Sequence, residues 1–218
     1  MTEGQNRRGV FIALEGGEGA GKSTQARLLA DALRKRGLTV DVTREPGGTP
    51  GAEAIRSLLL DPPGEGWCAP AEALLFAAAR SDHVAQRIKP ALARGEWVIS
   101  DRFLDSSRAY QGVAGELGDE AILALHEVGS GGFLPDMTLL IEVPDEEIAA
   151  RLAERDGGES DAIGGRDASY HRAVAAGFRQ FADEEPQRFV VIDGSGSAEE
   201  VHHRIMRALD ALLRDLGE

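Results

Sequence analysis

Short apolar stretches along the chain alternate with longer segments in which apolar residues recur at helical spacing. Five of the short stretches predict β-strands, at residues 10–14, 39–43, 97–100, 137–143 and 188–193. Each pair of consecutive stretches is separated by enough residues for a helical crossover, so we expect the strands to pair in parallel. The pattern predicts a doubly wound α/β fold, with a five-stranded parallel sheet flanked by helices.

Helical periodicity fills most of the chain between the predicted strands. The expected helices cover residues 23–36, 51–60, 70–94, 119–128, 145–154, 168–182 and 198–216. Ligands of such folds bind at the carboxyl ends of the strands, so the residues that follow each strand are the first candidates for chemistry. The stretch 156–165 is rich in Gly, Asp and Ser, and we expect a mobile lid at about 151–167, with a plain solvated loop as the alternative.

The size and composition of the chain favour one domain that works inside the cell. With 218 residues, of which 42% are apolar, the chain can bury one substantial core, so residues 1–218 are expected to form a single domain with a flexible start at 1–9. Cys68 is the one cysteine and has no partner for an internal disulfide, which is typical of a reducing cytoplasm. No apolar stretch approaches the roughly 18 residues that span a bilayer, and the polar start does not resemble a signal peptide, which argues against membrane insertion or export.

The net charge narrows the class of partner. A formal charge of −13 repels the backbone of DNA or RNA, which argues against a nucleic-acid partner. Any nucleotide that binds is therefore expected to be a small molecule, held by a few local arginines.

The segment after the first predicted strand matches the phosphate-binding motif G-x-x-x-x-G-K-[ST] at every position. Its glycines let successive backbone N–H groups point inward, and the following helix adds partial positive charge at its N-terminus. A lysine supplies an ammonium group for the β- and γ-phosphates, and a hydroxyl can reach Mg²⁺. The residues expected to hold a nucleoside triphosphate are Gly16, Gly17, Glu18, Gly19, Ala20, Gly21, Lys22, Ser23 and Thr24, with Ser23 as a metal ligand.

The third predicted strand leads directly into Asp101 and Arg102. A carboxylate at the end of a buried strand is placed to hold magnesium through water, and the adjacent guanidinium can bind a phosphate through paired N–H groups. Hydroxyl, phenol and amide groups follow within about three helical turns. They suit hydrogen bonding to a sugar or a base edge, although a helix N-cap by Asp105 or Ser106 explains one of them more simply.

These motifs, in this order, resemble those of the thymidylate kinase family, the P-loop enzymes that phosphorylate dTMP to dTDP with ATP. The resemblance covers nearly the whole chain and rests on residues 15–24, on 43–49 (TREPGGT), on 74–80 (LLFAAAR), on Asp101 and Arg102 with Ser106, Tyr110 and Gln111, and on 134–136 (LPD). It implies a P-loop NTPase fold, ATP and Mg²⁺ as cosubstrate and cofactor, dTMP as acceptor and a homodimer. An apolar helix face within 70–92 is available for that dimer, although such a face is more often core.

The resemblance also implies roles for individual residues. Phe76 lies against the thymine ring and Arg80 reaches its O4, and their i, i+4 spacing does put both side chains on one helix face. Cytosine carries an amino group at C4 in place of O4, and this group cannot accept a hydrogen bond from Arg80. Specificity for thymine over cytosine then follows from one missing acceptor. The remaining implied substrate contacts are Arg102 and Arg56 to the dTMP phosphate, Glu45 and Pro46 near the sugar and base, Glu18 near the 3′-hydroxyl, and Ser106, Ser107, Tyr110 and Gln111 in the hydrogen-bonding cluster.

Catalysis in such a site is positioning and charge neutralisation by Lys22, Mg²⁺ and arginines. Because Glu18 makes the phosphate loop acidic, the sequence resembles the branch of the family whose catalytic arginine comes from the lid. That lid usually reads Asp-Arg-Phe/Ile-Glu, but this chain has Asp-Ala-Ile-Gly at 161–164. We expect Arg155 to take the role, with Arg166 as the alternative; Arg151 is as readily explained by pairing with neighbouring acids.

Two other functions share part of this pattern. A kinase of another nucleoside monophosphate or of a deoxynucleoside needs the phosphate loop and Asp101-Arg102, but does not need Phe76 with Arg80. A GTPase-like switch reads guanine with Asn followed by Lys, whereas the single asparagine here is Asn6. The D-x-x-G match at 61–64 follows a predicted helix and is expected to be a turn.

Overall fold

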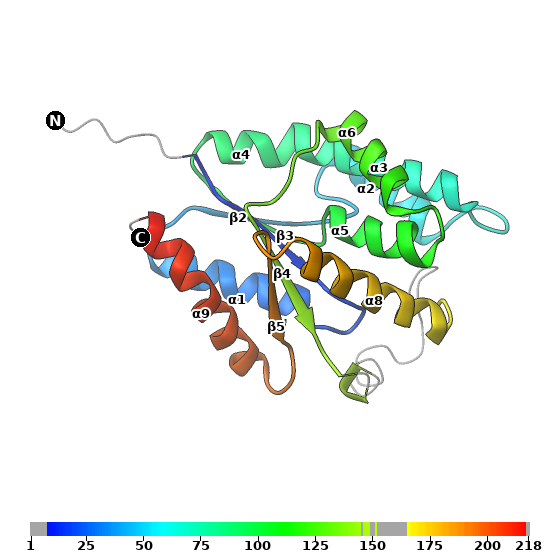
Figure 1. Cartoon of the computed structure of the whole chain (residues 1–218). Helices are drawn as coiled ribbons and strands as arrows, with labels where there is room; N and C mark the ends of the chain where they lie inside the picture. The colour runs from blue at the N-terminus through cyan, green and yellow to red at the C-terminus, as the bar shows by residue number, and fades with distance from the viewer. Residues whose placement is uncertain (1–7, 145, 149–150, 152–164, 217–218) are drawn as a thin grey trace.

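A parallel five-stranded sheet forms the centre of the molecule (Figure 1). The computed structural model describes residues 8–144, 146–148, 151 and 165–216. The strands, in the spatial order β2-β3-β1-β4-β5, are β1 (Phe11–Glu15), β2 (Val40–Arg44), β3 (Trp97–Asp101), β4 (Met137–Glu142) and β5 (Phe189–Asp193). All five predicted strands are therefore confirmed, and their parallel pairing follows from the crossovers between them.

The sheet register brings the ends of neighbouring strands level. Asp101 at the end of β3 pairs with Leu14 of β1 and with Arg44 of β2. β1 is the central strand and is buried along its whole length, so the loop that leaves it starts from the middle of the carboxyl edge. The polar residues that follow β1, β2 and β3 consequently gather at that one edge.

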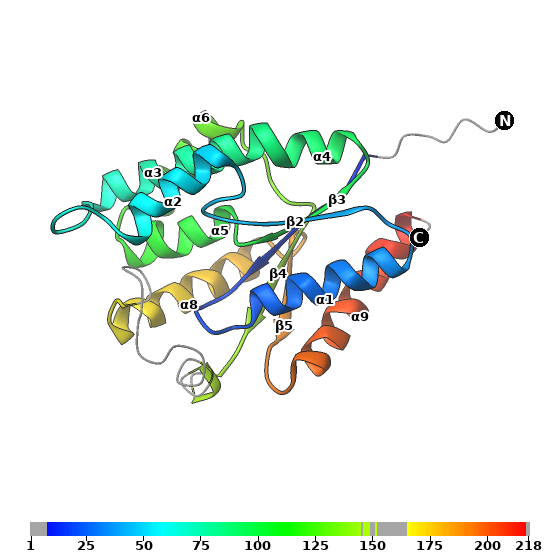
Figure 2. The same cartoon turned by 180° about the vertical axis from the view of Figure 1, so that it is seen from behind.

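One face of the sheet is covered by α1 (Lys22–Lys35) and α9 (Ala198–Leu216) (Figures 1 and 2). Leu29 and Leu33 of α1 pack with Ile205 and Leu209 of α9 against the apolar side chains of the strands. Each of these four side chains is fully buried. Burying them removes apolar surface from water and fixes the helix that follows the glycine loop.

The opposite face carries the remaining helices, and two apolar clusters hold them there. The first packs Phe11 of β1 against Phe103 and the second packs Tyr110 against Phe178 and Phe181. The helices on this side are α3 (Ala69–His83), α4 (Lys89–Ala93), α5 (Leu104–Ser107), α6 (Asp119–Ser130) and α8 (Ala168–Glu184), and α2 (Pro50–Leu60) packs against α3.

The predicted helix at 70–94 runs as expected but contains a π-helical segment. It comprises α3, then the π-helical η1 (Val84–Ile88), then α4, where the Lys89 N–H reaches the carbonyl of Val84. Pro90 has no N–H and its ring clashes with the carbonyl four residues earlier, so a regular α-helix cannot pass this point unchanged. The wider turn before Pro90 accommodates the proline.

The chain from Leu104 to Ala114 is helical; the periodicity did not predict a helix here, although the suggested N-cap implied one that starts nearby. It is formed by α5 and the π-helical η2 (Arg108–Ala114). The suggested N-cap at Asp105 or Ser106 is wrong, because both residues lie inside α5 and Phe103 occupies the N-cap position without a side-chain bond. Their side chains instead make long-range contacts.

Of the expected helix at 145–154, the described residues 146–148 and 151 are helical, and its other residues and most of the expected lid lie outside the described residues. Gly9, which we expected in a flexible start, is buried, and its N–H donates to the carbonyl of Leu92. The D-x-x-G match at 61–64 follows α2 and forms bends and turns, as predicted. Among the helices of the described chain, none has the length and apolar character required to span a membrane.

Candidate active site

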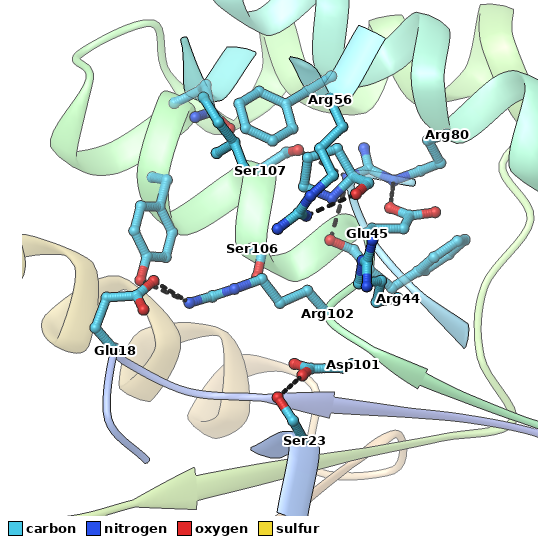
Figure 3. Close-up of a pocket in the computed structure, with 16 residues that line it drawn as sticks. Glu18, Ser23, Arg44, Glu45, Arg56, Arg80, Asp101, Arg102, Ser106 and Ser107 are labelled. Carbon is cyan, nitrogen blue, oxygen red and sulfur yellow. Dashed lines mark hydrogen bonds and ion pairs between the residues drawn. The ribbon is translucent and has the colours of Figure 1, made fainter. Parts of the chain in front are cut away.

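A cavity of about 310 Å³ opens at the carboxyl edge of the sheet, where the ends of β2 and β3 meet the glycine loop, α2, α3 and η2 (Figure 3). Every residue that the resemblance implied as a substrate contact lines it, as do both expected metal ligands. The lining comprises Glu18, Ser23, Glu45, Pro46, Arg56, Phe76, Arg80, Asp101, Arg102, Ser106, Ser107, Tyr110 and Gln111, together with Arg44, Leu60 and Phe103.

The glycine loop has the backbone conformation of a phosphate-binding loop. Gly16, Gly19 and Gly21 have φ values of 141°, 71° and 84°, which L side chains rarely adopt. A Cβ on Gly16 would also lie 2.4 Å from the backbone oxygen of Ile141. The loop leads into the first turn of α1, whose N–H groups are free of helical partners and favour an anion.

Lys22 folds back into this loop. Its Nζ donates to the carbonyl of Gly17 at 2.7 Å and to that of Gly16 at 3.1 Å. Burial and the nearby Arg102 guanidinium lower the pKa of Lys22 to about 8, and carboxylates including Asp101 oppose this shift. A buried ammonium group beside the loop is suited to bind a phosphate anion.

Ser23 and Asp101 meet at the mouth of the loop. The Ser23 hydroxyl, in the first turn of α1, donates to Oδ2 of Asp101 at the end of β3 (Figure 3). The described residues contain no group of three or more His, Cys, Asp or Glu side chains placed to hold a metal ion by themselves. A hydroxyl and one carboxylate nevertheless fit Mg²⁺ that is shared with bound phosphates, because Mg²⁺ usually binds through one or two carboxylates plus substrate oxygens.

Arg102 connects the glycine loop to η2. It has a positive φ of 71°, which is uncommon outside glycine. Nη1 donates to the carbonyl of Gly16 and the hydroxyl of Ser106, at 3.2 and 3.0 Å, while Nη2 donates to Glu18 Oε1 at 2.5 Å and to the Tyr110 hydroxyl at 3.2 Å. Burial lowers the pKa of Arg102, but Tyr110 and the carboxylates around it outweigh burial and raise it above the ordinary value, so the guanidinium stays charged.

Glu15, which the sequence analysis missed, holds the turn that presents Arg102. Its Oε1 accepts from the N–H groups of Phe103 and Ser106, at 2.8 and 3.2 Å, and its Oε2 accepts from the Ser106 hydroxyl at 2.6 Å. Burial, reinforced by the Asp105 carboxylate, raises the pKa of Glu15 to about 7. An acidic residue that ends an otherwise apolar strand was the signal available in the sequence.

Arg80 is buried at the far end of the cavity, and most of its donors are occupied. Nε donates to Glu45 at 2.8 Å, and Nη2 donates to the Ser107 hydroxyl and the Phe103 carbonyl, at 2.8 and 3.2 Å. Its Nη1 makes no hydrogen bond within the described part of the chain. Phe76, one helical turn earlier, lines the same cavity, so the guanidinium can offer Nη1 to a ligand beside an aromatic ring.

The Glu45 carboxylate lines the cavity, but its hydrogen bonds go to Arg80 and His83. It lies between Arg80 and His83, whose Nδ1 is 2.9 Å from Oε1, and the other ring nitrogen of His83 meets the Thr43 hydroxyl at 2.7 Å. Burial raises the pKa of Glu45, but Arg80 and His83 outweigh it and leave the pKa below the ordinary value. Glu45 therefore contributes to the cavity mainly by holding Arg80 in place.

Positive charge predominates around the cavity. Four arginines line it, against three carboxylates. Arg56 of α2 donates to the carbonyl of Pro46 at 2.8 Å, and Arg44, which the sequence analysis did not single out, pairs with Glu53 at 3.1 Å. The arrangement favours an anionic ligand next to the glycine loop.

The candidate lid arginines differ in position. Arg155 lies outside the described residues. Arg166 donates to Glu72 of α3 and to the Tyr170 hydroxyl, and it does not line the cavity. Arg151 donates to Glu147 and to the carbonyls of Gly194 and Gly196, in the loop that follows β5. This supports pairing as the explanation for Arg151.

Comparisons with known proteins agree on one family. The family model for thymidylate kinase matches residues 14–205. A thymidylate kinase of Rhizorhabdus wittichii is 58% identical over 205 residues, which cover 94% of this chain and 99% of that protein. A thymidylate kinase of Rhodopseudomonas palustris (strain ATCC BAA-98 / CGA009) is 54% identical, covering 93% of this chain and 89% of that protein.

A solved structure agrees with these sequence matches. The crystal structure of thymidylate kinase from Ehrlichia chaffeensis superimposes with a TM-score of 0.74 at 32% identity, covering 93% of this chain and 100% of that chain.

Proposed function

The chain belongs to the thymidylate kinase family and phosphorylates dTMP, and we propose that it does so by transferring the γ-phosphoryl group of ATP in the presence of Mg²⁺. One observation carries the proposal: the glycine loop with Lys22 opens on the same cavity as Arg80 and Phe76, with Arg102 between them. A triphosphate site and a site for a nucleoside monophosphate thus adjoin in one cavity. This arrangement suits transfer of a phosphoryl group from one nucleotide to the other.

The acceptor nucleotide lies between Arg102 and Arg80 in this proposal. Arg102, with Arg56, holds its 5′-phosphate near the glycine loop. Phe76 lies against the thymine ring, and Nη1 of Arg80 donates to O4. Because Nη1 is a fixed donor, cytosine is rejected: its amino group cannot accept a hydrogen bond there. The sugar and base contacts come from Glu18, Pro46, Ser106, Ser107, Tyr110 and Gln111, and Glu45 acts through Arg80.

The donor nucleotide occupies the glycine loop. The loop N–H groups and the Lys22 ammonium bind its β- and γ-phosphates, and Lys22 exchanges its bonds to the loop carbonyls for bonds to phosphate oxygens. Ser23 and Asp101 are the residues that hold Mg²⁺, which when bound neutralises phosphate charge and orients the oxygens. Catalysis then requires little covalent work, since the chain aligns two phosphates and neutralises their charge.

A further arginine is needed where negative charge develops on the transferred group. Glu18 makes the glycine loop acidic, so the loop cannot supply that arginine itself. We propose Arg155 for the role, because Arg166 is already bonded to Glu72 and Tyr170.

A phosphate-transfer screen tests the proposed function. The purified protein is incubated with ATP, Mg²⁺ and dTMP, dUMP, dCMP or dGMP in turn, and the diphosphate products are separated. We expect the highest kcat/KM with dTMP and no turnover after chelation of the metal. Higher activity on any other acceptor would overturn the assignment and favour a kinase of another nucleotide.

Arg80→Met separates base recognition from phosphate transfer in that screen. The variant should lose dTMP turnover through a higher KM, because the contact to O4 is removed; since Glu45 is then buried with His83 as its remaining partner, thermal unfolding must establish that the variant folds. Phe76 and the glycine loop remain. An unchanged KM for dTMP would remove Arg80 from the base site.

We also propose that two copies associate through α3 and α6. Leu74 of α3 is 56% exposed, and Leu123 and Val128 of α6 are 40% and 89% exposed. The two helices pack against each other, and exposed apolar side chains on adjacent helices commonly mark interfaces.

A free, exposed Cys68 supports a cytoplasmic location.

A further inference from the structure

Gln111, which lines the cavity from η2, is fixed by a carboxylate behind it. Its amide nitrogen Nε2 donates to Oε1 of Glu72, in the first turn of α3, at 2.9 Å. Both side chains are buried, with 2% of Gln111 and 9% of Glu72 exposed. A carboxylate only accepts hydrogen bonds, so the nitrogen end of the amide must face Glu72.

This orientation decides which atom of Gln111 remains for a ligand. No hydrogen bond within the described part of the chain reaches its Oε1, so the amide offers the cavity an acceptor and not a donor. Arg80 lines the same cavity, bonds through Nη2 to Ser107, one helical turn before Gln111, and offers a donor through Nη1. The cavity wall therefore presents a donor, Arg80 Nη1, and an acceptor, Gln111 Oε1, and the two cannot exchange roles.

This pair matches the edge of thymine, which has an acceptor at O4 next to a donor at N3–H. Cytosine has the reverse pattern, a donor amino group next to an acceptor N3. An acceptor fixed at Gln111 would bind N3–H of thymine and repel the lone pair on N3 of cytosine. If the amide were free to rotate, Gln111 could instead offer its NH₂ group to cytosine.

Glu72 is itself held in place from the end of the expected lid and the start of α8. Arg166 donates to Oε2 of Glu72, on the oxygen that Gln111 does not use, and its guanidinium lies 4.5 Å from the centre of the Tyr170 ring. The Tyr170 hydroxyl donates to the backbone carbonyl of Tyr110 at 2.7 Å, one residue before Gln111. Arg166 thus fixes the carboxylate that Gln111 bonds to, and Tyr170 fixes the backbone next to Gln111.

We propose that Glu72 is a positioning residue for base selection, which locks the Gln111 amide with its carbonyl oxygen toward N3–H of the base, and that Arg166 holds Glu72 in place. The inference rests on the proposed dTMP site. It concerns residues that do not themselves touch the nucleotide.

The Glu72→Gln variant tests this proposal, because an amide at position 72 can accept from or donate to Gln111 and no longer fixes its orientation. We expect the ratio of kcat/KM for dTMP to that for dCMP to fall by at least about tenfold, the factor that corresponds to one hydrogen bond. The ratio for dTMP to dUMP should stay constant, because these bases share the edge that Gln111 faces and differ only in the C5 methyl group.

The matched control is Glu120→Gln, which makes the same change of charge at an exposed position of α6. Its selectivity should equal that of the wild type. In a Gln111→Met background, Glu72→Gln should have no additional effect on the ratio of dTMP to dCMP, because the amide that it positions is gone.

Three results would overturn the proposal. They are an unchanged dTMP-to-dCMP ratio in a folded Glu72→Gln variant, an equal loss in the dTMP-to-dUMP ratio, and an undiminished effect in the Gln111→Met background. Thermal unfolding establishes that the variants fold. Should Glu72→Gln not fold, Arg166→Gln provides the same test, with at least a threefold fall in the dTMP-to-dCMP ratio expected, and an unchanged ratio overturns the proposal. A wild-type protein inactive on dTMP would instead refute the proposed function itself.

Discussion

The ammonium group of Lys22 is enclosed by the loop that is proposed to bind the triphosphate. Two loop carbonyls accept its hydrogen bonds, and burial together with Arg102 lowers the pKa of Lys22 to about 8. Below that pH the group is mostly charged in the nucleotide-free protein. Above that pH the neutral amine predominates, and it carries no positive charge to attract a phosphate anion.

Binding of ATP should therefore weaken as the pH rises above about 8. We expect Kd to be nearly constant from pH 6.5 to 7.5 and to increase toward tenfold per pH unit above about pH 8, because a proton must then be taken up on binding. Calorimetry in the presence of Mg²⁺ measures this. Lys22→Met should bind weakly with little pH dependence, and a wild-type Kd that is equal at pH 7 and pH 9 would contradict the interpretation.

Arg155 is the residue on which the proposed chemistry depends most. If it neutralises charge on the transferred group, Arg155→Ala should lower kcat by on the order of 10³, as for other arginine fingers. Steady-state kinetics with dTMP and ATP measures the change. Arg172→Ala, at an exposed position of α8, is the control and should be nearly unaffected. A loss that falls mainly on the KM for ATP would assign Arg155 to nucleotide binding instead.

At the scale of elements, a buried network of charges attaches the substrate-facing helices to the rest of the fold. Asp105 of α5 is fully buried and accepts from Arg188, which precedes β5, at 2.6 and 2.9 Å. Arg108 of η2 joins Asp105, Asp119 of α6 and Glu185. The network fixes η2, and with it Tyr110 and Gln111, relative to α6 and β5.

Arg188→Met should destabilise the protein strongly, because it leaves Asp105 buried with Arg108 as its remaining cationic partner. Removing one partner of a buried ion pair costs about 3–5 kcal/mol, and we expect a loss near the lower end because Arg108 remains. Urea unfolding measures it. Arg179→Met, which removes an exposed ion pair with Glu142, should cost about 0–1 kcal/mol. Equal losses in the two variants would show that burial does not govern the energy of the network.

At the scale of the whole molecule, the exposed apolar surface of α3 and α6 determines the oligomeric state that we expect. Leu74→Glu combined with Val128→Glu places two charges on that surface and should convert a dimer into a monomer, because charge is not tolerated in a dry interface. Light scattering coupled to gel filtration measures the mass. Val191→Glu, at a 41% exposed position of β5, is the control and should remain dimeric. A monomeric wild-type protein would contradict the proposed association.

Most of the fold and the location of the site could be predicted because their signals are local in the chain. The glycine loop is a continuous stretch, and each strand is a short apolar run, so neither depends on distant residues. Parallel pairing then requires the residues after β1, β2 and β3 to share one edge, which is why Ser23, Asp101 and Arg102 were expected together. The π-helical turns and α5 were not predicted, because tertiary packing stabilises them.

The sequence by itself determined the order of the elements and the phosphate loop, since these follow from spacing along one chain, and its resemblance to a family implied most of the residues around the cavity. Only the tertiary structure decided what those residues do to one another. Glu15 supports the turn at Arg102, and Glu72 orients Gln111 while pairing with Arg166. Partners so far apart in sequence meet only through packing, and the same packing excludes the water that would otherwise hold the pKa of Lys22 near its ordinary value.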